Sequence, residues 1–97
     1  MATYIALCNF TDQGIRNIKE TTERADAVKK AAGALGVEMT QIYWTLGQYD
    51  LIAVVEAADD EAATAFALSV GQAGNVRPQT LRAFSAGELN GILRKLA

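Results

Sequence analysis

The strongest constraint in this chain is a strand-like run that is apolar on both sides. Five consecutive residues, from Leu51 to Val55, are aliphatic. Successive side chains of a strand point to opposite faces, so Leu51, Ala53 and Val55 share one face and Ile52 and Val54 share the other. A sheet with one face in water alternates apolar and polar residues instead. We therefore predict that both faces of this strand are covered.

A turn precedes this strand. Gly47 lies between an aromatic, β-branched run and the aliphatic run, and such a glycine is typical of a hairpin turn that needs a positive φ or a close backbone approach. We predict that it joins strands at 37–46 and 49–57. Tyr49 and Asp50 would then enter the second strand side by side and point to opposite faces.

The remaining segments add two strands and three helices. Apolar residues recur every three or four positions after Thr11 or Asp12, which predicts a first helix that ends before Gly36. Asp59 is the predicted N-cap of a second helix, and Ser85 opens a capping box before a short last helix. Strands are predicted at 3–10 and 75–84. The predicted buried stripe of the first helix is Ile15, Ile18, Thr22, Ala25, Val28, Ala32 and Leu35.

The order of these elements predicts the fold. A β-α-β-β-α-β order with an extra C-terminal helix is the ferredoxin-like pattern of an α+β protein, here a single domain over residues 1–97. Right-handed crossovers place the first and third strands in the centre of the antiparallel four-stranded sheet and both long helices on one face. Pro78 lacks an N–H, which favours a sheet edge for the last strand.

The second face of the sheet then needs a cover. An uncovered apolar face of several hundred Å² is unusual in a monomer, so we expect a second copy of the chain to pack sheet to sheet and to bury more than about 1,000 Å². The C-terminal helix is the rival cover. Its large apolar residues on one side are Leu89, Ile92, Leu93 and Leu96.

Composition excludes several function classes. The chain has no histidine, a net charge of −2 and one cysteine, Cys8. Without histidine the commonest metal ligand and general base are missing, and we expect neither a metal nor a cofactor. A slightly acidic chain is a poor ligand for nucleic acid, and no apolar run reaches the length that crosses a membrane. A lone cysteine and the lack of a signal peptide favour the cytoplasm.

The turn Gly47-Gln48-Tyr49-Asp50 resembles the signature of the GYD domain family. The segments 11–19, 74–77 and 80–84 also look like parts of that family, so the resemblance covers nearly the whole chain. It implies a ferredoxin-like domain of the dimeric α+β-barrel type. It implies little chemistry, because the family consists of small bacterial and archaeal proteins without an assigned activity, and fold analogy does not choose a function.

The turn region also holds candidate site residues. Asp50 could act as a general base or bind a ligand, or it could accept backbone N–H groups near Gly47. Tyr49 could orient a substrate, or it could pack its ring and bond its hydroxyl locally. Trp44 or its neighbour Tyr43 could stack on a planar ligand or anchor an interface.

Glu56 and Arg82 form a further candidate pair. Their long side chains could meet on the face that carries Ile52 and Val54, across a gap of about 9–10 Å. Such a pair could bind an anion or fix the register of a dimer.

Two hypotheses follow from these residues. The first is an oligomeric module that binds a small ligand or a protein. The second is a cofactor-free enzyme of the dimeric α+β-barrel type, an oxygenase or isomerase for a small aromatic or polar substrate, although the sequence names no catalytic residue. An enclosed cavity of at least about 300 Å³ with Asp50 or Arg82 in its wall would favour the second hypothesis.

Overall fold

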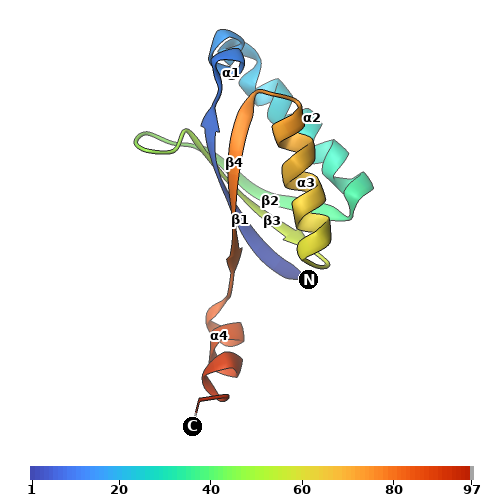
Figure 1. Cartoon of the computed structure of the whole chain (residues 1–97), viewed down its shortest axis with the longest axis vertical. Helices are drawn as coiled ribbons and strands as arrows, with labels where there is room; N and C mark the ends of the chain where they lie inside the picture. Colours follow the sequence, from blue (N-terminus) through green and yellow to red (C-terminus); the bar gives the residue numbers. More distant parts are fainter. Residues whose placement is uncertain (97) are drawn as a thin grey trace.

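The computed structural model describes residues 1–96 and contains an antiparallel four-stranded sheet with two long helices on one face (Figure 1). The described elements are β1 (Ala2–Phe10), α1 (Asp12–Arg16), the 3-10 turn η1 (Ile18–Glu20), α2 (Thr21–Ala32), the 3-10 turn η2 (Gly33–Leu35), β2 (Val37–Trp44), β3 (Leu51–Ala57), α3 (Asp60–Gln72), β4 (Val76–Ala83) and α4 (Ala86–Leu93).

The strand order β2-β3-β1-β4 confirms the ferredoxin-like prediction, with β1 and β3 central. Pro78 lies on the edge strand β4, opposite Cys8 of β1. At an edge, a residue without an N–H leaves the ladder intact on the side that has a neighbour.

The hydrophobic core lies between the sheet and the helices α2 and α3. Tyr4, Val55 and Ala57 are buried on this side of the two central strands, and Phe66 of α3 packs against them. Asp59 caps α3 as predicted, because its carboxylate accepts the N–H of Ala62 at 2.9 Å. The alternate strand residues that face the helices thus form one compact apolar layer.

The prediction of one continuous first helix is wrong. The backbone leaves the helical conformation at Asn17 (φ −106°, ψ 29°), and the segment is divided into α1, η1, α2 and η2. The change of direction turns Ile15 and Ile18 outward, with 55% and 39% of their surface exposed, and Leu35 in η2 is 38% exposed. Within α2, Val28 packs against the core and Ala32 is fully buried.

Helix α1 is held by the turn between α3 and β4. The backbone N–H of Thr11 donates to the carbonyl of Asn75 at 3.1 Å, and the Thr11 hydroxyl accepts the N–H of Gly14. A Cβ at Gly14 would lie 2.1 Å from the carbonyl oxygen of Asn75, so only glycine fits there. This contact joins segments that are far apart in the sequence and fixes where β1 ends.

A bulge in β2 decides which of its side chains face the helices. Met39 pairs with Val55, but Gln41 pairs with Val54, so one extra residue is accommodated at Thr40. Beyond the bulge the alternation is inverted, and Trp44 faces the helices while Tyr43 faces away. Without the bulge, alternation from Met39 would turn Tyr43 toward the helices and Trp44 away from them.

Helix α4 projects from the body of the molecule. The chain extends past the end of β4, and α4 lies clear of the sheet, which gives the molecule its 52 Å long axis (Figure 1). The capping box is present as predicted, with Ser85 and Glu88 bonded to each other's backbone N–H. The rival prediction that this helix covers the second sheet face is therefore wrong.

Candidate interaction surface

The centre of the sheet face opposite the helices is apolar, and no helix among residues 1–96 covers it. We call it the open face and define it by five aliphatic residues, namely Ile5, Leu7, Ile52, Val54 and Leu81. Ile5 pairs with Val54 on one side and with Leu81 on the other, and Leu7 pairs with Ile52, so the five side chains are contiguous. They shield one another, and Leu81 on the edge is 40% exposed. The sheet therefore presents an apolar surface to whatever lies next to it.

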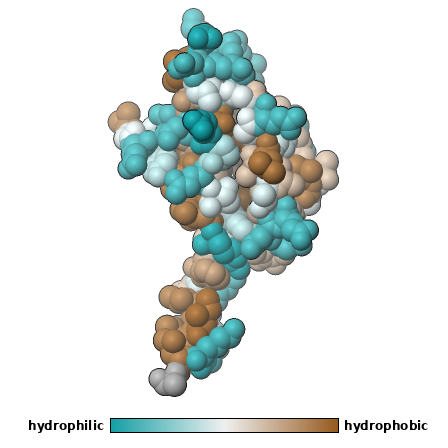
Figure 2. Space-filling view, viewed as in Figure 1, coloured by the Kyte–Doolittle hydropathy of each residue, from teal (hydrophilic) through white to brown (hydrophobic). Residues whose placement is uncertain are grey.

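Helix α4 and the three residues that follow it carry a second apolar surface. Leu89, Ile92, Leu93 and Leu96 follow helical spacing and are 38–71% exposed. Figure 2 shows hydrophobic atoms over most of this helix, with hydrophilic atoms along one side. We call these four residues the α4 stripe.

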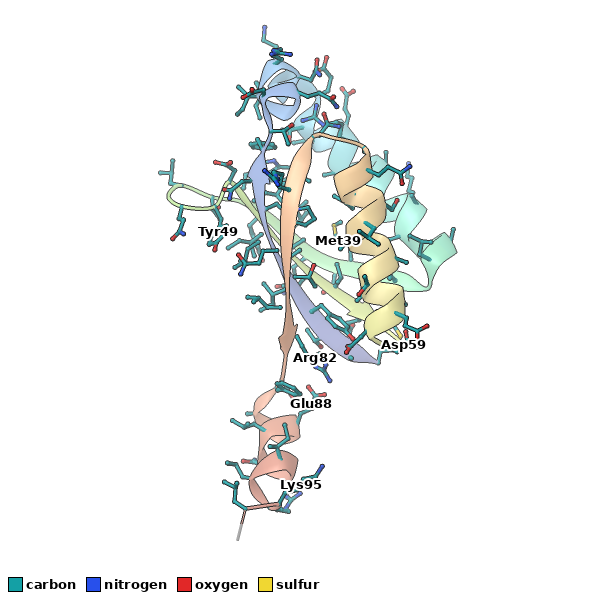
Figure 3. All side chains as sticks on the ribbon, in the orientation of Figure 1. Met39, Tyr49, Asp59, Arg82, Glu88 and Lys95 are labelled. Atoms are coloured by element: carbon teal, nitrogen blue, oxygen red, sulfur yellow. The ribbon has the colours of Figure 1, made fainter. Side chains whose placement is uncertain are left out.

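Arg82 links α4 to the sheet. Its guanidinium lies 4.4 Å from the ring centre of Phe84 and 5.6 Å from that of Tyr4. One of its nitrogens, Nη2, is 3.8 Å from Glu88 Oε2, and Nη1 donates to the carbonyl of Thr3 at 3.3 Å. The hydrogen bond from the Ser85 N–H lowers the pKa of Glu88, and Arg82 adds to this effect. Arg82 is thus a positioning residue for the start of α4 (Figure 3).

The predicted pair of Glu56 and Arg82 is wrong. Glu56 is opposite Thr3 and Arg82 is opposite Tyr4, and consecutive residues of β1 point to opposite faces of the sheet. Glu56 lies beside the open face, directly across from Glu38 of β2. The two long side chains therefore cannot meet through the sheet, and parity along a single strand could not reveal this without the register of β4.

Asp50 has a structural partner, although not the predicted one. Its Oδ2 accepts the backbone N–H of Phe10 at 2.9 Å, and its own N–H donates to the carbonyl of Cys8. The carboxylate thus satisfies the last N–H of β1 instead of the backbone near Gly47. Gly47 itself has a φ of +115°, with no atom near its Cβ position, so it is required for its conformation and not for close packing.

Tyr49 and Trp44 also have local partners. The Tyr49 hydroxyl donates to Gln79 Oε1 of β4 at 3.1 Å, above the end of the open face. The Trp44 indole N–H donates to the hydroxyl of Thr21 at 3.0 Å and so ties β2 to the start of α2. Of the five candidate ligand residues, the structure brings only Tyr49 and Glu56 to the side of the open face, at opposite ends of it.

Cavities in this fold are small or shallow. An apolar cavity of about 90 Å³ lies between the sheet and the helices, with Met39, Phe66 and Val76 in its wall. A wider hollow of about 410 Å³ near Lys29 and Thr40 is open to solvent. Neither Asp50 nor Arg82 lines either space, and the one between the sheet and the helices is smaller than a cavity for a typical small-molecule ligand.

The Cys8 thiol and the Tyr4 phenol are buried in the core. Burial raises the pKa of the Cys8 thiol to about 11, so it is protonated at neutral pH and a poor nucleophile. Tyr4 donates to Asp60 Oδ1 at 2.5 Å, and this hydrogen bond raises the pKa of the phenol. Among residues 1–96, no three carboxylate or cysteine side chains converge on one point as metal ligands would, and no helix is long and apolar enough to span a membrane.

Comparison with known proteins identifies the family. The family model of the GYD domain matches residues 4–93. The chain belongs to the GYD domain family. It is 32% identical, over 92% of its length and 95% of the relative, to a Thermus thermophilus protein described as "glutamine synthetase and cystathionine beta-lyase binding protein". The crystal structure of TTHA0845 from Thermus thermophilus is similar, with a TM-score of 0.58 and 26% identity over 89% of this chain and 96% of that one.

Sequence reasoning missed two groups of residues in this GYD protein. The link from Arg82 to Tyr4 and Phe84 depends on how β4 pairs with β1, which no local pattern shows. The bond between Tyr4 and Asp60 joins residues 56 positions apart. The helical spacing of the α4 stripe could be recognised in the sequence. Its position outside the sheet could not, because that depends on the direction in which the chain leaves β4.

Proposed function

We propose that this GYD protein is a non-catalytic interaction module of the cytoplasm that pairs with a second copy through its open face and, in that form, binds a protein partner. The observation that carries the proposal is the uncovered apolar face defined by Ile5, Leu7, Ile52, Val54 and Leu81. Water contact with such a surface costs about 25 cal/mol per Å² relative to burial, so covering it favours association.

The relative from Thermus thermophilus supports the second part of the proposal. It is described as binding two enzymes, and this chain matches 95% of its length. We propose that the present chain likewise binds an enzyme of amino-acid metabolism, with glutamine synthetase as the first partner to test. Binding through a preformed surface needs no catalytic group, which agrees with the structural partners of Asp50, Tyr49 and Trp44.

The enzyme hypothesis has less support. Its conditions were an enclosed cavity of at least about 300 Å³ and a wall that contains Asp50 or Arg82. The cavity between the sheet and the helices measures about 90 Å³ and is lined by neither residue. The carboxylate of Asp50 already accepts a backbone N–H, and Arg82 is engaged by Glu88 and two aromatic rings.

Light scattering coupled to size-exclusion chromatography tests the self-association. Wild-type protein should elute with the mass of a dimer or larger assembly, and Val54→Lys should shift it toward a single chain, because the new ammonium would be buried in the interface. Ser69→Lys is the matched control, since Ser69 is exposed on α3, on the other side of the molecule. A wild-type protein with the mass of one chain would contradict the proposal.

Biolayer interferometry tests the partner. The wild-type chain is immobilised, and glutamine synthetase and cystathionine β-lyase from the same organism are supplied in solution, with an unrelated enzyme of similar size and charge as a control. We expect saturable binding of at least one of the two enzymes. Equal signals for both enzymes and the control up to about 50 µM, a concentration at which weak complexes are still populated, would contradict it.

A further inference from the structure

The α4 stripe and the open face point to the same side of the molecule. Figures 1–3 share one orientation, in which α2 and α3 lie to the right of β1 and β4, so the open face of these strands is turned to the left. In this view the labelled Glu88 and Lys95 lie on the right side of α4 (Figure 3), and hydrophobic atoms cover its left side (Figure 2). The stripe therefore continues the apolar surface of the sheet beyond the end of β4.

The sheet alone is small for a stable interface. Four strands about 4.8 Å apart, paired over seven rows of about 3.3 Å, give the whole sheet a plan area of about 440 Å², and the five residues of the open face occupy only part of it. A standard interface buries about 800 Å² on each partner. Helix α4, which is eight residues long, adds a strip about 12 Å by 10 Å on the same side. A copy that covers both surfaces comes closer to the required area than one that covers the sheet alone.

Two-fold symmetry decides which part of the second copy can cover the stripe. A two-fold axis parallel to the strands keeps both copies of α4 at the same end of the pair, whereas an axis across the strands places them at opposite ends. In the first arrangement each stripe meets its own equivalent, so that apolar residues cover apolar residues. In the second arrangement each stripe lies instead at the end of the partner's sheet that carries the turn between β2 and β3.

We infer that the second copy covers the α4 stripe with its own α4, so that the two helices lie side by side at one end of the dimer. This inference rests on the self-association proposed above and adds its symmetry and a second contact. Arg82 sets the direction of α4 through Phe84, Tyr4 and Glu88, and thereby presents the stripe on the side of the open face. The charged side of α4, with Lys95, stays in solvent.

Distance measurement between two spin labels tests the arrangement. A nitroxide is attached to Lys95→Cys in a Cys8→Ala background, and double electron–electron resonance reports the distance between the labels of the two copies. Packed helices lie about 8–10 Å apart, so labels on their outer sides should be within about 30 Å. Each molecule is 52 Å long, so helices at opposite ends would separate the labels by more than one molecular length.

A substitution in the stripe provides an independent readout. Leu89→Ser should raise the dissociation constant of the dimer at least tenfold in sedimentation equilibrium, because Leu89 is 45% exposed in the single chain and would be covered by the partner's stripe. Arg94→Ser is the matched control on the opposite side of the helix and should change it less than twofold. An unchanged dissociation constant for Leu89→Ser would overturn the contact between the helices.

The outcomes separate this inference from the proposed function. A dimer by light scattering with widely separated labels would overturn the pairing of the helices and leave the sheet-to-sheet dimer standing. A single chain by light scattering would overturn both. A dimer with a short label distance, weakened by Leu89→Ser, supports both.

Discussion

At the scale of single residues, Asp50 shows how a signature residue can serve the fold. Its carboxylate satisfies the N–H of Phe10, where β1 continues past its last pairing with β3. Asp50→Ala would leave this N–H without a partner, at a cost of about 1–2 kcal/mol in the free energy of unfolding. Asp50→Asn keeps an oxygen acceptor and should lose less.

Urea denaturation measures these differences. Asp26→Ala, at an exposed position of α2, is the control for removal of a carboxylate and should change the unfolding midpoint little. If Asp50→Ala unfolded at the same urea concentration as the wild type, the structural role of Asp50 would be excluded and a role in binding would become the better explanation.

The buried thiol of Cys8 makes the free energy of unfolding depend on pH in the alkaline range. Burial raises the pKa of its thiol from 9.0 to about 11 in the folded chain. The folded state thus holds the proton more tightly than the unfolded state. The contribution of the protonated thiol to the free energy of unfolding is therefore fully present below pH 9 and is lost as the pH rises toward 11. The loss amounts to about 3 kcal/mol at most, since one pKa unit corresponds to about 1.4 kcal/mol and the shift is about two units.

Chemical denaturation at pH 8 and pH 11 tests this dependence. The wild type should lose more stability over the interval than Cys8→Ala, which lacks the thiol and reports the contribution of all other groups, including Tyr4. Equal losses in the two proteins would show that the thiol ionises as readily in the folded chain as in the unfolded one.

At the scale of elements, α4 depends on its cap more than on packing. The Ser85 hydroxyl accepts the Glu88 N–H at 3.1 Å, and Glu88 accepts the Ser85 N–H at 2.9 Å. Ser85→Ala should remove about 1 kcal/mol from an eight-residue helix that is linked to the sheet through Arg82 and Glu88 but does not pack on it. Because the pKa of Glu88 is lowered, its half of the cap is present above the ordinary glutamate pKa and is lost as the pH falls through the lowered value.

Hydrogen exchange locates the effect. Amides of residues 86–93 should exchange faster in Ser85→Ala than in the wild type, while those of β1 and β3 keep their rates. Ser69→Ala, within α3, serves as the control. Unchanged protection of α4 in Ser85→Ala would mean that contacts other than the cap hold this helix.

Elements were predictable from the sequence where local chemistry decides them. The caps at Asp59 and Ser85, the turn at Gly47 and the edge position of Pro78 each follow from one residue type in one backbone context. The break at Asn17 and the bulge at Thr40 did not follow, because each depends on partners elsewhere in the chain. Glu56 and Arg82 were paired wrongly for the same reason, since face assignment needs the register of three strands.

At the scale of the whole molecule, the main feature is the open face, because α2 and α3 cover only the other side of the sheet. The prediction that both faces of β3 need a cover came from five aliphatic residues, and the structure covers only the face that carries Leu51, Ala53 and Val55. A chain of 97 residues has a modest core, so burial of the open face between copies would add a large share of its stability.

Thermal unfolding at several concentrations tests this contribution. If the folded protein is a dimer and the unfolded chain is not, mass action raises the melting temperature with concentration. A tenfold increase in protein corresponds to about 1.4 kcal/mol per dimer, which is about 3–5 °C for an unfolding unit of two such chains. Val54→Lys should melt lower and show no concentration dependence, whereas Ser69→Lys should behave as the wild type. A wild-type melting temperature that stayed constant over a hundredfold range of concentration would mean that a single chain tolerates the open face in water.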